Sequence, residues 1–278
     1  MARMNFTVLG ATGFIGAHQV QALQEQGHAV FAPARGDAAL FTQPLGHVLY
    51  CVGLTADFRE RPYETVDAHV GLLRDVLARA DFGSLLYLSS TRVYAGAGTA
   101  REESTLLVDP QAADSLYNLS KLLGESLCFA TGRPVIRVVR LSNVVGDDPH
   151  SPNFLASIVR DAVHKGRVQL MTQPSSAKDY VTVADVVALL PRIAQVGKAR
   201  LYNVASGQNT RHSQLLDQVK AATGCRVDIA PYAPLSTFAP IAIDRIQREF
   251  DFNPSPIGEA VERLIARVKE NEAGHAAH

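Results

Sequence analysis

The sequence has few of the residues that build disulfide frameworks or metal sites. It contains only three cysteines, Cys51, Cys128 and Cys225, which are far apart and odd in number. That usage argues against disulfides and favours a reducing compartment. The histidines are scattered, and no group of cysteines and histidines has the spacing of metal ligands. We therefore expect no metal site.

An excess of one charge and long apolar runs are also missing. The chain has 27 Lys and Arg against 27 Asp and Glu, a net charge of zero. This balance argues against a broad electrostatic grip on nucleic acid or on an anionic membrane surface, so we expect neither partner. There is no apolar run of about 20 residues that would span a bilayer. The N-terminus passes straight into Asn5–Leu9 without a signal-like segment, and we expect a cytoplasmic protein.

What is present is an alternation of short apolar runs and longer helical patterns. The chain has 278 residues, 47% of them apolar, which is enough for a large core and two lobes. Alternation of strands and helices predicts an α/β protein, a Rossmann-like doubly wound parallel sheet with helices on both faces. We expect strands at 6–9, 29–32, 48–52, 85–89 and 135–141, and helices at 13–26, 65–80 and 115–130.

The second half of the chain has a different pattern. A turn-rich break at 147–152 is followed by a helix at 154–164 and by shorter elements, and 225–240 is expected to be irregular. These shorter elements are strands at 168–171, 180–183 and 201–204, and helices at 183–194 and 213–222. We predict a dinucleotide-binding domain made of 1–145 and 178–205, and a smaller, interleaved substrate lobe made of 146–177 and 206–278.

A glycine-rich loop directly follows the first strand. Its spacing is Gly-x-x-Gly-x-x-Gly, where the dinucleotide fingerprint is Gly-x-Gly-x-x-Gly. Glycines allow a tight turn and a close backbone approach, and the helix start behind them offers free N–H groups to a pyrophosphate. The candidate cofactor-binding residues in this loop are Gly10, Thr12, Gly13, Phe14, Ile15 and Gly16.

The end of the second strand indicates which dinucleotide binds. An acidic residue there suits the ribose of NAD, and an arginine nearby suits the 2′-phosphate of NADP. No acidic residue ends this strand, and Arg35 stands just past it with a guanidinium that recognises phosphate. We predict NADP, with NAD possible. Two alternatives stay open: Asp37 could turn back to a ribose, or Arg35 could be only a solvated charge.

Tyr117 and Lys121 lie four residues apart in the predicted helix at 115–130, so they share one helical face. A phenol is a poor acid or base at neutral pH because its reference pKa is roughly 10. A nearby ammonium favours the phenolate. The pair is therefore suited to proton transfer at a carbonyl or an alcohol.

An ordered set of motifs accompanies this pair. Taken together, they resemble the extended branch of the short-chain dehydrogenase/reductase superfamily, the sugar-nucleotide epimerase/dehydratase-like enzymes. The motifs are Gly10 to Gly16, Leu88 to Tyr94, Tyr117 to Glu125, Arg140 to Gly146, Lys178 to Val187 and Asn203 to Gly207.

The resemblance implies roles for single residues. Tyr117 would be the general acid/base, and Lys121 would hold the nicotinamide ribose and stabilise the phenolate. Ser90 would hydrogen-bond the reacting oxygen, with Thr91 as its rival for that role. Tyr94 could pack in the core or line the active site. The implied substrate-binding residues are Ser90, Thr91, Asn143 and Lys178, the last two near a diphosphate.

Some positions depart from the family pattern. The short stretch between the second and third strands leaves no room for a helix and strand that relatives have, so the adenine side is trimmed. Lys178 replaces an arginine, which keeps charge but loses the forked geometry. Thr91 and Arg92 stand where dehydratases carry an acidic pair, which argues against dehydration.

Three functions remain open. The first is NADPH-dependent reduction of a keto group on a nucleotide-linked sugar or a natural-product intermediate. The second is an epimerase that oxidises and then reduces one carbon. The third is a non-catalytic dinucleotide sensor, since fold alone does not specify function. The resemblance also implies a homodimer formed through the helices at 65–80 and 115–130.

Overall fold

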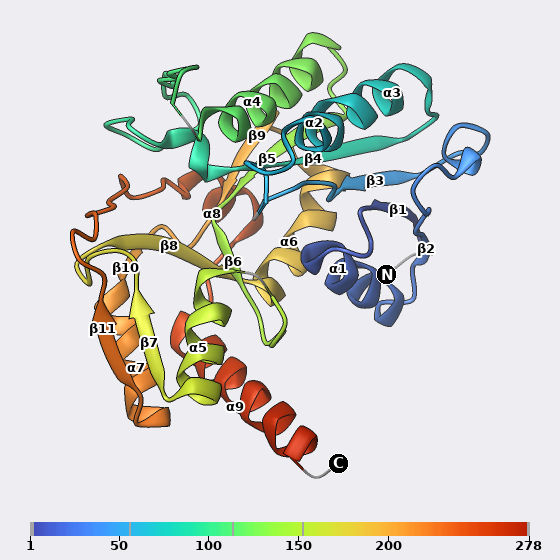
Figure 1. The fold of residues 1–278 in the computed structure, drawn as a ribbon. Coiled ribbons are helices and arrows are strands. Elements are labelled where there is room, and N and C mark those ends of the chain that lie inside the picture. Colours follow the sequence, from blue (N-terminus) through green and yellow to red (C-terminus); the bar gives the residue numbers. More distant parts are fainter. Residues whose placement is uncertain (1–2, 56, 113, 152, 277–278) are drawn as a thin grey trace.

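The computed structural model describes residues 3–55, 57–112, 114–151 and 153–276. Its centre is a sheet of six parallel strands in the order β2-β1-β3-β4-β5-β9. The strands are nearly continuous apolar runs because helices cover both faces of the sheet (Figure 1). Their bounds are β1 (Asn5–Leu9), β2 (Ala29–Phe31), β3 (His47–Tyr50), β4 (Ser84–Ser90), β5 (Ile136–Leu141) and β9 (Leu201–Val204).

Two groups of helices sandwich the sheet. One face packs against α1 (Phe14–Glu25) and α6 (Val183–Val196). The other face packs against a run that begins with α2 (Pro62–Val66), passes through the π-helical turn η2 (Asp67–Gly71) and continues as α3 (Leu72–Arg79), together with α4 (Ser115–Ala130). Side chains along each strand alternate between the two faces. Leu49 therefore joins the core under α1 and α6, whereas Val48 and Tyr50 join the core under α3 and α4.

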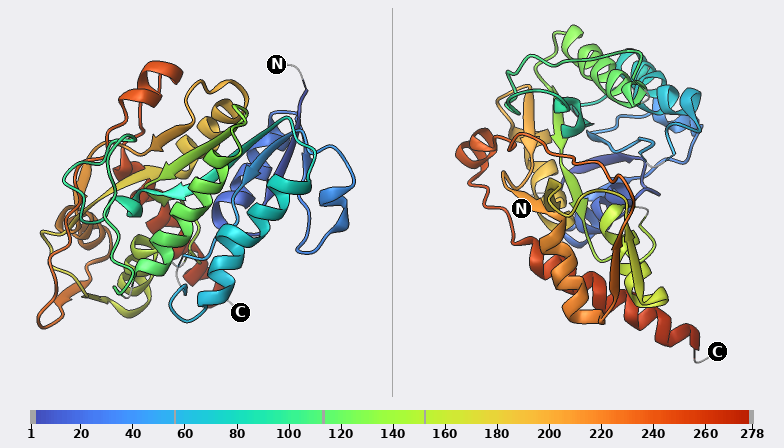
Figure 2. Two further views of the ribbon diagram at one scale, coloured as in Figure 1. Left: turned by 90° about the horizontal axis from the view of Figure 1, so that it is seen from above. Right: turned by 60° about the vertical axis from the view of Figure 1, so that its left-hand side comes forward.

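The rest of the chain forms a second region with its own buried cluster (Figure 2). Its elements are a three-stranded sheet in the order β10-β8-β6, a two-stranded sheet of β7 and β11, and three packed helices. The bounds are β6 (Asn143–Val145), α5 (Phe154–Lys165), β7 (Arg167–Leu170), β8 (Ala177–Thr182), β10 (Asn209–Arg211), α7 (His212–Thr223), β11 (Arg226–Ile229) and α9 (Ile257–Ala276). The helix α8 (Asp244–Phe250) packs instead beside β9.

The predicted α/β doubly wound fold is confirmed, and most predicted elements begin and end within a few residues of the observed ones. One expectation is wrong: the stretch 225–240 is not irregular throughout, because β11 pairs in parallel with β7 there. The order of elements shows the short connection between the second and third strands that the sequence predicted. Only the short 3-10 helix η1 (Ala38–Phe41) lies between β2 and β3, and β2 ends the sheet.

Within the described residues, none of the helices combines the length and apolar character that a bilayer crossing requires.

Candidate active site

The phosphate loop connects β1 to α1 and is too tight for side chains at two of its glycines. Gly10 has a φ of +82°, and a Cβ there would lie 2.9 Å from the backbone carbon of Cys51. A Cβ on Gly16 would collide with the carbonyl oxygen of Gly10. The loop can therefore close only with glycine at both positions, which brings the start of α1 against the end of β1.

Gly13 serves a different purpose. It caps α1 with extended backbone, and no side chain caps the first N–H groups of that helix. Neighbouring parts of the protein do not crowd Gly13, because the described atom within 4 Å of a Cβ built there is the Gly10 carbonyl oxygen, at 3.4 Å. The space before the helix start is thus open to an outside group, and uncapped N–H groups at the positive end of a helix suit a pyrophosphate. These residues fit a dinucleotide cofactor.

The turn after β2 distinguishes Arg35 from Asp37. The Asp37 carboxylate accepts a hydrogen bond of 2.9 Å from the Ala39 N–H and caps η1. Arg35 is exposed and makes no ion pair within the part of the chain that the structure describes. The carboxylate is therefore engaged in local structure, while the guanidinium remains available to a ligand.

The predicted acid/base groups meet at the carboxyl end of β4. Tyr117 and Lys121 are both buried on α4, with 4% and 5% exposure. The Lys121 ammonium donates a 2.8 Å hydrogen bond to the Leu88 carbonyl, which anchors α4 to β4. The Tyr117 phenol interacts with the hydroxyls of Ser90, at the end of β4, and Thr55, in the loop after β3.

Burial dominates the electrostatics of both groups. Desolvation raises the pKa of Tyr117, and three neighbours oppose it: the Ser90 hydroxyl, the Arg92 charge and the Thr55 hydroxyl. The phenol therefore keeps its proton at neutral pH. Desolvation lowers the pKa of Lys121 to about 7, against the attraction of Glu125. The ammonium thus titrates close to physiological pH.

The structure distinguishes Ser90 from Thr91, the two candidates for the hydroxyl that binds the reacting oxygen. It also shows where Tyr94 lies. Ser90 is half-buried and caps the 3-10 helix η3 (Thr91–Tyr94), accepting from the Arg92 N–H at 3.2 Å. Its O–H remains able to donate. Thr91 is buried inside η3. Tyr94 is also buried, and its hydroxyl donates to the Asn203 side chain at 2.8 Å. Tyr94 is therefore part of the interior and not of a substrate surface.

A buried ion pair fixes α4 behind Tyr117 and Lys121. Arg140 on β5 donates two hydrogen bonds of 3.0 and 2.6 Å to Glu125, one turn after Lys121. Ser89 donates to the same carboxylate at 2.5 Å, and Arg140 donates to Tyr94 at 2.8 Å. The charges are paired and their remaining polar atoms are bonded, as burial requires. This network joins α4, β4, β5 and η3.

Of the four predicted substrate-binding residues, Asn143 and Lys178 lie on neighbouring strands of the small sheet. Asn143, at the start of β6, is exposed and donates to the Asp179 carbonyl at 2.8 Å. Lys178 on β8 is half-buried, and its Nζ lies 5.7 Å from the centre of the Phe154 ring. Burial and the Arg92 charge lower the pKa of Lys178. Since the Arg92 charge acts on both Tyr117 and Lys178, it connects the predicted acid/base groups to this strand pair.

Comparisons with known proteins identify the family of this chain. Residues 6–205 match the family described as the NAD dependent epimerase/dehydratase family. The chain belongs to this family. The predicted enzyme class, an NAD(P)-dependent oxidoreductase or epimerase of the extended short-chain dehydrogenase/reductase type, is thereby confirmed.

Individual relatives are similar over nearly the whole chain. A Streptomyces protein named dTDP-4-dehydro-6-deoxy-D-allose reductase is 26% identical over 306 aligned positions, covering 92% of this chain and 93% of the relative. MoeE5, in complex with UDP-glucose and NAD, has the same fold, with a TM-score of 0.82, 19% identity and coverage of 96% and 99%. RMD from Pseudomonas aeruginosa, complexed with NADPH, has a TM-score of 0.77 at 22% identity, again covering 96% and 99%.

Sequence reasoning on this family member missed three residues beside Tyr117. The guanidinium of Arg92 lies 5.2 Å from the centre of the Tyr117 ring and is bound to Asp114 at 2.6 Å. Thr55 faces the phenol from the loop after β3. The His69 ring lies edge-on to Tyr117 at 5.3 Å. Arg92 could have been predicted as a site residue, because it directly follows the motif hydroxyls Ser90 and Thr91. Nothing in the local sequence distinguishes Thr55 or His69.

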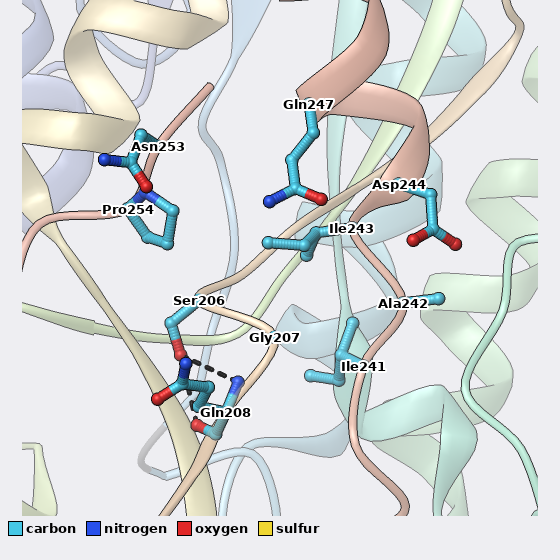
Figure 3. A pocket seen from close by; sticks show the side chains of 10 residues that line it. All are labelled: Ser206, Gly207, Gln208, Ile241, Ala242, Ile243, Asp244, Gln247, Asn253 and Pro254. Carbon is cyan, nitrogen blue, oxygen red and sulfur yellow. Dashed lines mark hydrogen bonds between the residues drawn. The ribbon is translucent and has the colours of Figure 1, made fainter. Parts of the chain in front are cut away.

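A cavity of about 320 Å³ lies apart from these groups (Figure 3). It is formed by the turn Ser206–Gln208, the segment 241–244 and residues Gln247, Asn253 and Pro254. Its one acidic side chain, Asp244, is already paired with Arg101 at 3.0 Å. None of the predicted site residues lines it, so it is separate from the acid/base site of the family.

Proposed function

We propose that this chain is an NADPH-dependent reductase that converts a keto group on a nucleotide-linked sugar to an alcohol. The observation that carries the proposal is the buried Tyr117 phenol, held beside the Ser90 hydroxyl with Lys121 one helical turn behind it. A phenol that keeps its proton at neutral pH is set to donate one, which is the direction of reduction. The relative named as a reductase of a dTDP-linked keto sugar supports this direction.

The residues divide the chemistry as follows. The nicotinamide, when bound, supplies the hydride. The Ser90 O–H donates to the carbonyl oxygen of the substrate and orients it. Tyr117 transfers its proton to that oxygen as the alcohol forms, and the Lys121 ammonium stabilises the phenolate left behind. Proton return to Tyr117 from solvent completes the cycle.

Two further features support the choice of cofactor and substrate. Arg35 is free to contact a 2′-phosphate, whereas Asp37 is used as a helix cap. Lys178 and Arg92 supply two cations on the substrate side, and among the described residues their one acidic partner is Asp114, which Arg92 shares with Arg59. Two cations with one countercharge suit an anionic diphosphate, and the Asn143 amide stands at the same strand pair.

The remaining assignments belong to the same proposal. The cofactor domain comprises 1–145 and 178–205, and the substrate lobe comprises 146–177 and 206–278; a separate buried cluster in the lobe supports this division, although Ile246 and Phe250 of the lobe pack in the core of the sheet. The protein works in the cytoplasm as a homodimer. Exposed Leu119 and Leu123 on α4 favour that helix as the contact. A monomer in light scattering at micromolar concentration would contradict the dimer.

The deciding experiment is single-turnover incubation of the enzyme with NADPH and a panel of keto-sugar nucleotides. We expect loss of the reduced-nicotinamide absorbance and formation of an alcohol with at least one dTDP-linked 4-keto sugar. Isomerised sugar with no net consumption of NADPH would replace the reductase with the epimerase. Binding of NADPH with no turnover on any member of the panel would favour the sensor.

A further inference from the structure

We propose that His69 is a positioning residue of this active site, which fastens the loop after β3 to the helix of Tyr117 and Lys121. The inference builds on the proposed function but rests on its own contacts. His69 is fully buried in η2, the π-helical turn between α2 and α3. A π-turn inside a helix is rare and frequently occurs at functional sites.

The hydrogen bonds of His69 determine its tautomer. The Leu54 N–H donates to Nε2 at 3.3 Å, and a backbone N–H can only donate, so Nε2 is the acceptor. In the neutral ring Nδ1 then carries the proton. It donates to the Ser120 hydroxyl at 2.8 Å, and Ser120 donates in turn to the Tyr117 carbonyl at 3.0 Å. One chain of hydrogen bonds thus runs from the loop after β3 to the backbone of the catalytic tyrosine.

The ring is also packed against the Tyr117 side chain. It meets the Tyr117 ring edge-on, at 5.3 Å and 87°. Gly53 lies close to the ring. A side chain at this position would crowd the site, because its Cβ would lie 3.3 Å from both His69 Nε2 and Lys121 Nζ. The backbone of His69 is held as well, since its carbonyl accepts from Tyr87 at 3.2 Å. These partners lie in the loop after β3, in α4 and in β4, so the ring cannot shift without moving the site.

These contacts define what His69 does. The loop that it holds carries Thr55, which faces the Tyr117 phenol, and the helix that it holds carries Lys121. Burial and the Lys121 charge lower the pKa of His69 to about 2, so the ring stays neutral at working pH. His69 therefore transfers no proton. It sets the distance between the phenol, its hydroxyl partners and the ammonium, and small displacements of such groups cost much activity.

The test uses three variants at His69. His69→Asn keeps an amide near the Nδ1 position and preserves the bond to Ser120, whereas His69→Gln keeps one near Nε2 and preserves the bond to Leu54. His69→Ala removes both. We expect kcat in the alanine variant to fall about 10- to 100-fold, with KM for the sugar changed less than about threefold. We expect the asparagine variant to recover a large part of that loss.

The matched control is His47, which makes the same kind of bond to a serine, 2.9 Å to Ser84, at the opposite end of β3. We expect His47→Ala to lower the melting temperature without changing kcat. A kcat for His69→Ala within about threefold of wild type would overturn the proposal. So would failure of both amide variants to exceed the alanine variant, because fixed positioning is the property that they restore.

A second measurement needs no substrate. NADPH affinity is followed by nicotinamide fluorescence across pH, and the midpoint at which binding weakens reports Lys121. Removing the buried His69 ring lessens the desolvation that lowers the pKa of Lys121, so we expect this midpoint to rise in His69→Ala by about half a pH unit or more. An unmoved midpoint would overturn the positioning role. Wild-type protein that binds NADPH but reduces nothing would instead contradict the proposed function.

Discussion

At the scale of single residues, Tyr117 is controlled by opposing influences on its proton. Burial keeps the phenol protonated, while Ser90, Arg92 and Thr55 favour the phenolate. The balance suits an acid that must release its proton only to a substrate oxygen. Spacing on one helix predicted the Tyr117–Lys121 pair, and the resemblance of Leu88 to Tyr94 to a family motif predicted Ser90. The sequence could not predict Thr55 or His69, whose nearness to Tyr117 arises from long-range packing.

The first prediction concerns Tyr117→Phe. Loss of the phenol proton should lower kcat for keto-sugar reduction by about 10²- to 10⁴-fold, the usual contribution of a general acid. NADPH affinity should stay within a few-fold, since the ring and Lys121 remain. The check is steady-state kinetics with fluorescence titration of NADPH, using Tyr63→Phe at an exposed tyrosine as the control. Activity within tenfold of wild type would remove Tyr117 from the role of acid.

The second prediction concerns pH and Lys121. Its pKa in the folded protein is about 7, lowered from the usual value by burial. The ammonium is therefore present below pH 7 and lost above it, and with it the stabilisation of the phenolate. We expect kcat/KM for reduction to fall as pH rises through about 7. The profile measured for Lys121→Met should be lower and lack this step. A flat wild-type profile between pH 6 and 9 would contradict the assignment.

At the scale of elements, the sequence predicted the alternating core because apolar runs bounded by glycine and polar turns are local signals. The elements that it missed are short or depend on distant partners. β6 and β10 have three residues each and exist through pairing with β8. Likewise β11 pairs with β7, in a stretch whose prolines suggested irregular chain. The interruption of the helical run by η2 also has no local signature in the sequence.

The third prediction belongs to the loop after β2 and uses two neighbouring substitutions. Arg35→Ala should raise KM for NADPH about tenfold or more and leave KM for NADH within twofold, because only NADPH carries the 2′-phosphate. Asp37→Ala should lower the free energy of unfolding by about 0.5–2 kcal/mol through loss of the η1 cap, with both KM values unchanged. An increase in KM for NADH in the Asp37 variant would instead place its carboxylate on the ribose.

At the scale of the whole molecule, stability in acid depends on two buried neutral histidines. Burial and the Lys121 charge lower the pKa of His69 to about 2, and burial and the Lys178 charge lower the pKa of His212 to about 4. Both rings are fully buried. In the unfolded chain each ring binds a proton below pH 6.5, whereas in the folded protein it does not. The unfolded state therefore binds more protons, and the free energy of unfolding must fall as pH drops below 6.5.

The last prediction distinguishes the two histidines by the pH at which each stops lowering the free energy of unfolding. Each fully buried histidine should contribute about 1.4 kcal/mol of lost stability per pH unit below its unfolded pKa. The contribution of His212 should level off near pH 4, while that of His69 continues to lower pH. Urea unfolding of wild type, His212→Gln and His69→Gln, measured from pH 7 to pH 3, separates these from carboxylate titration that all three share. Each variant should lose less stability than wild type between pH 6.5 and 4.5. Parallel curves for wild type and a variant would show that the ring in question takes up its proton without unfolding.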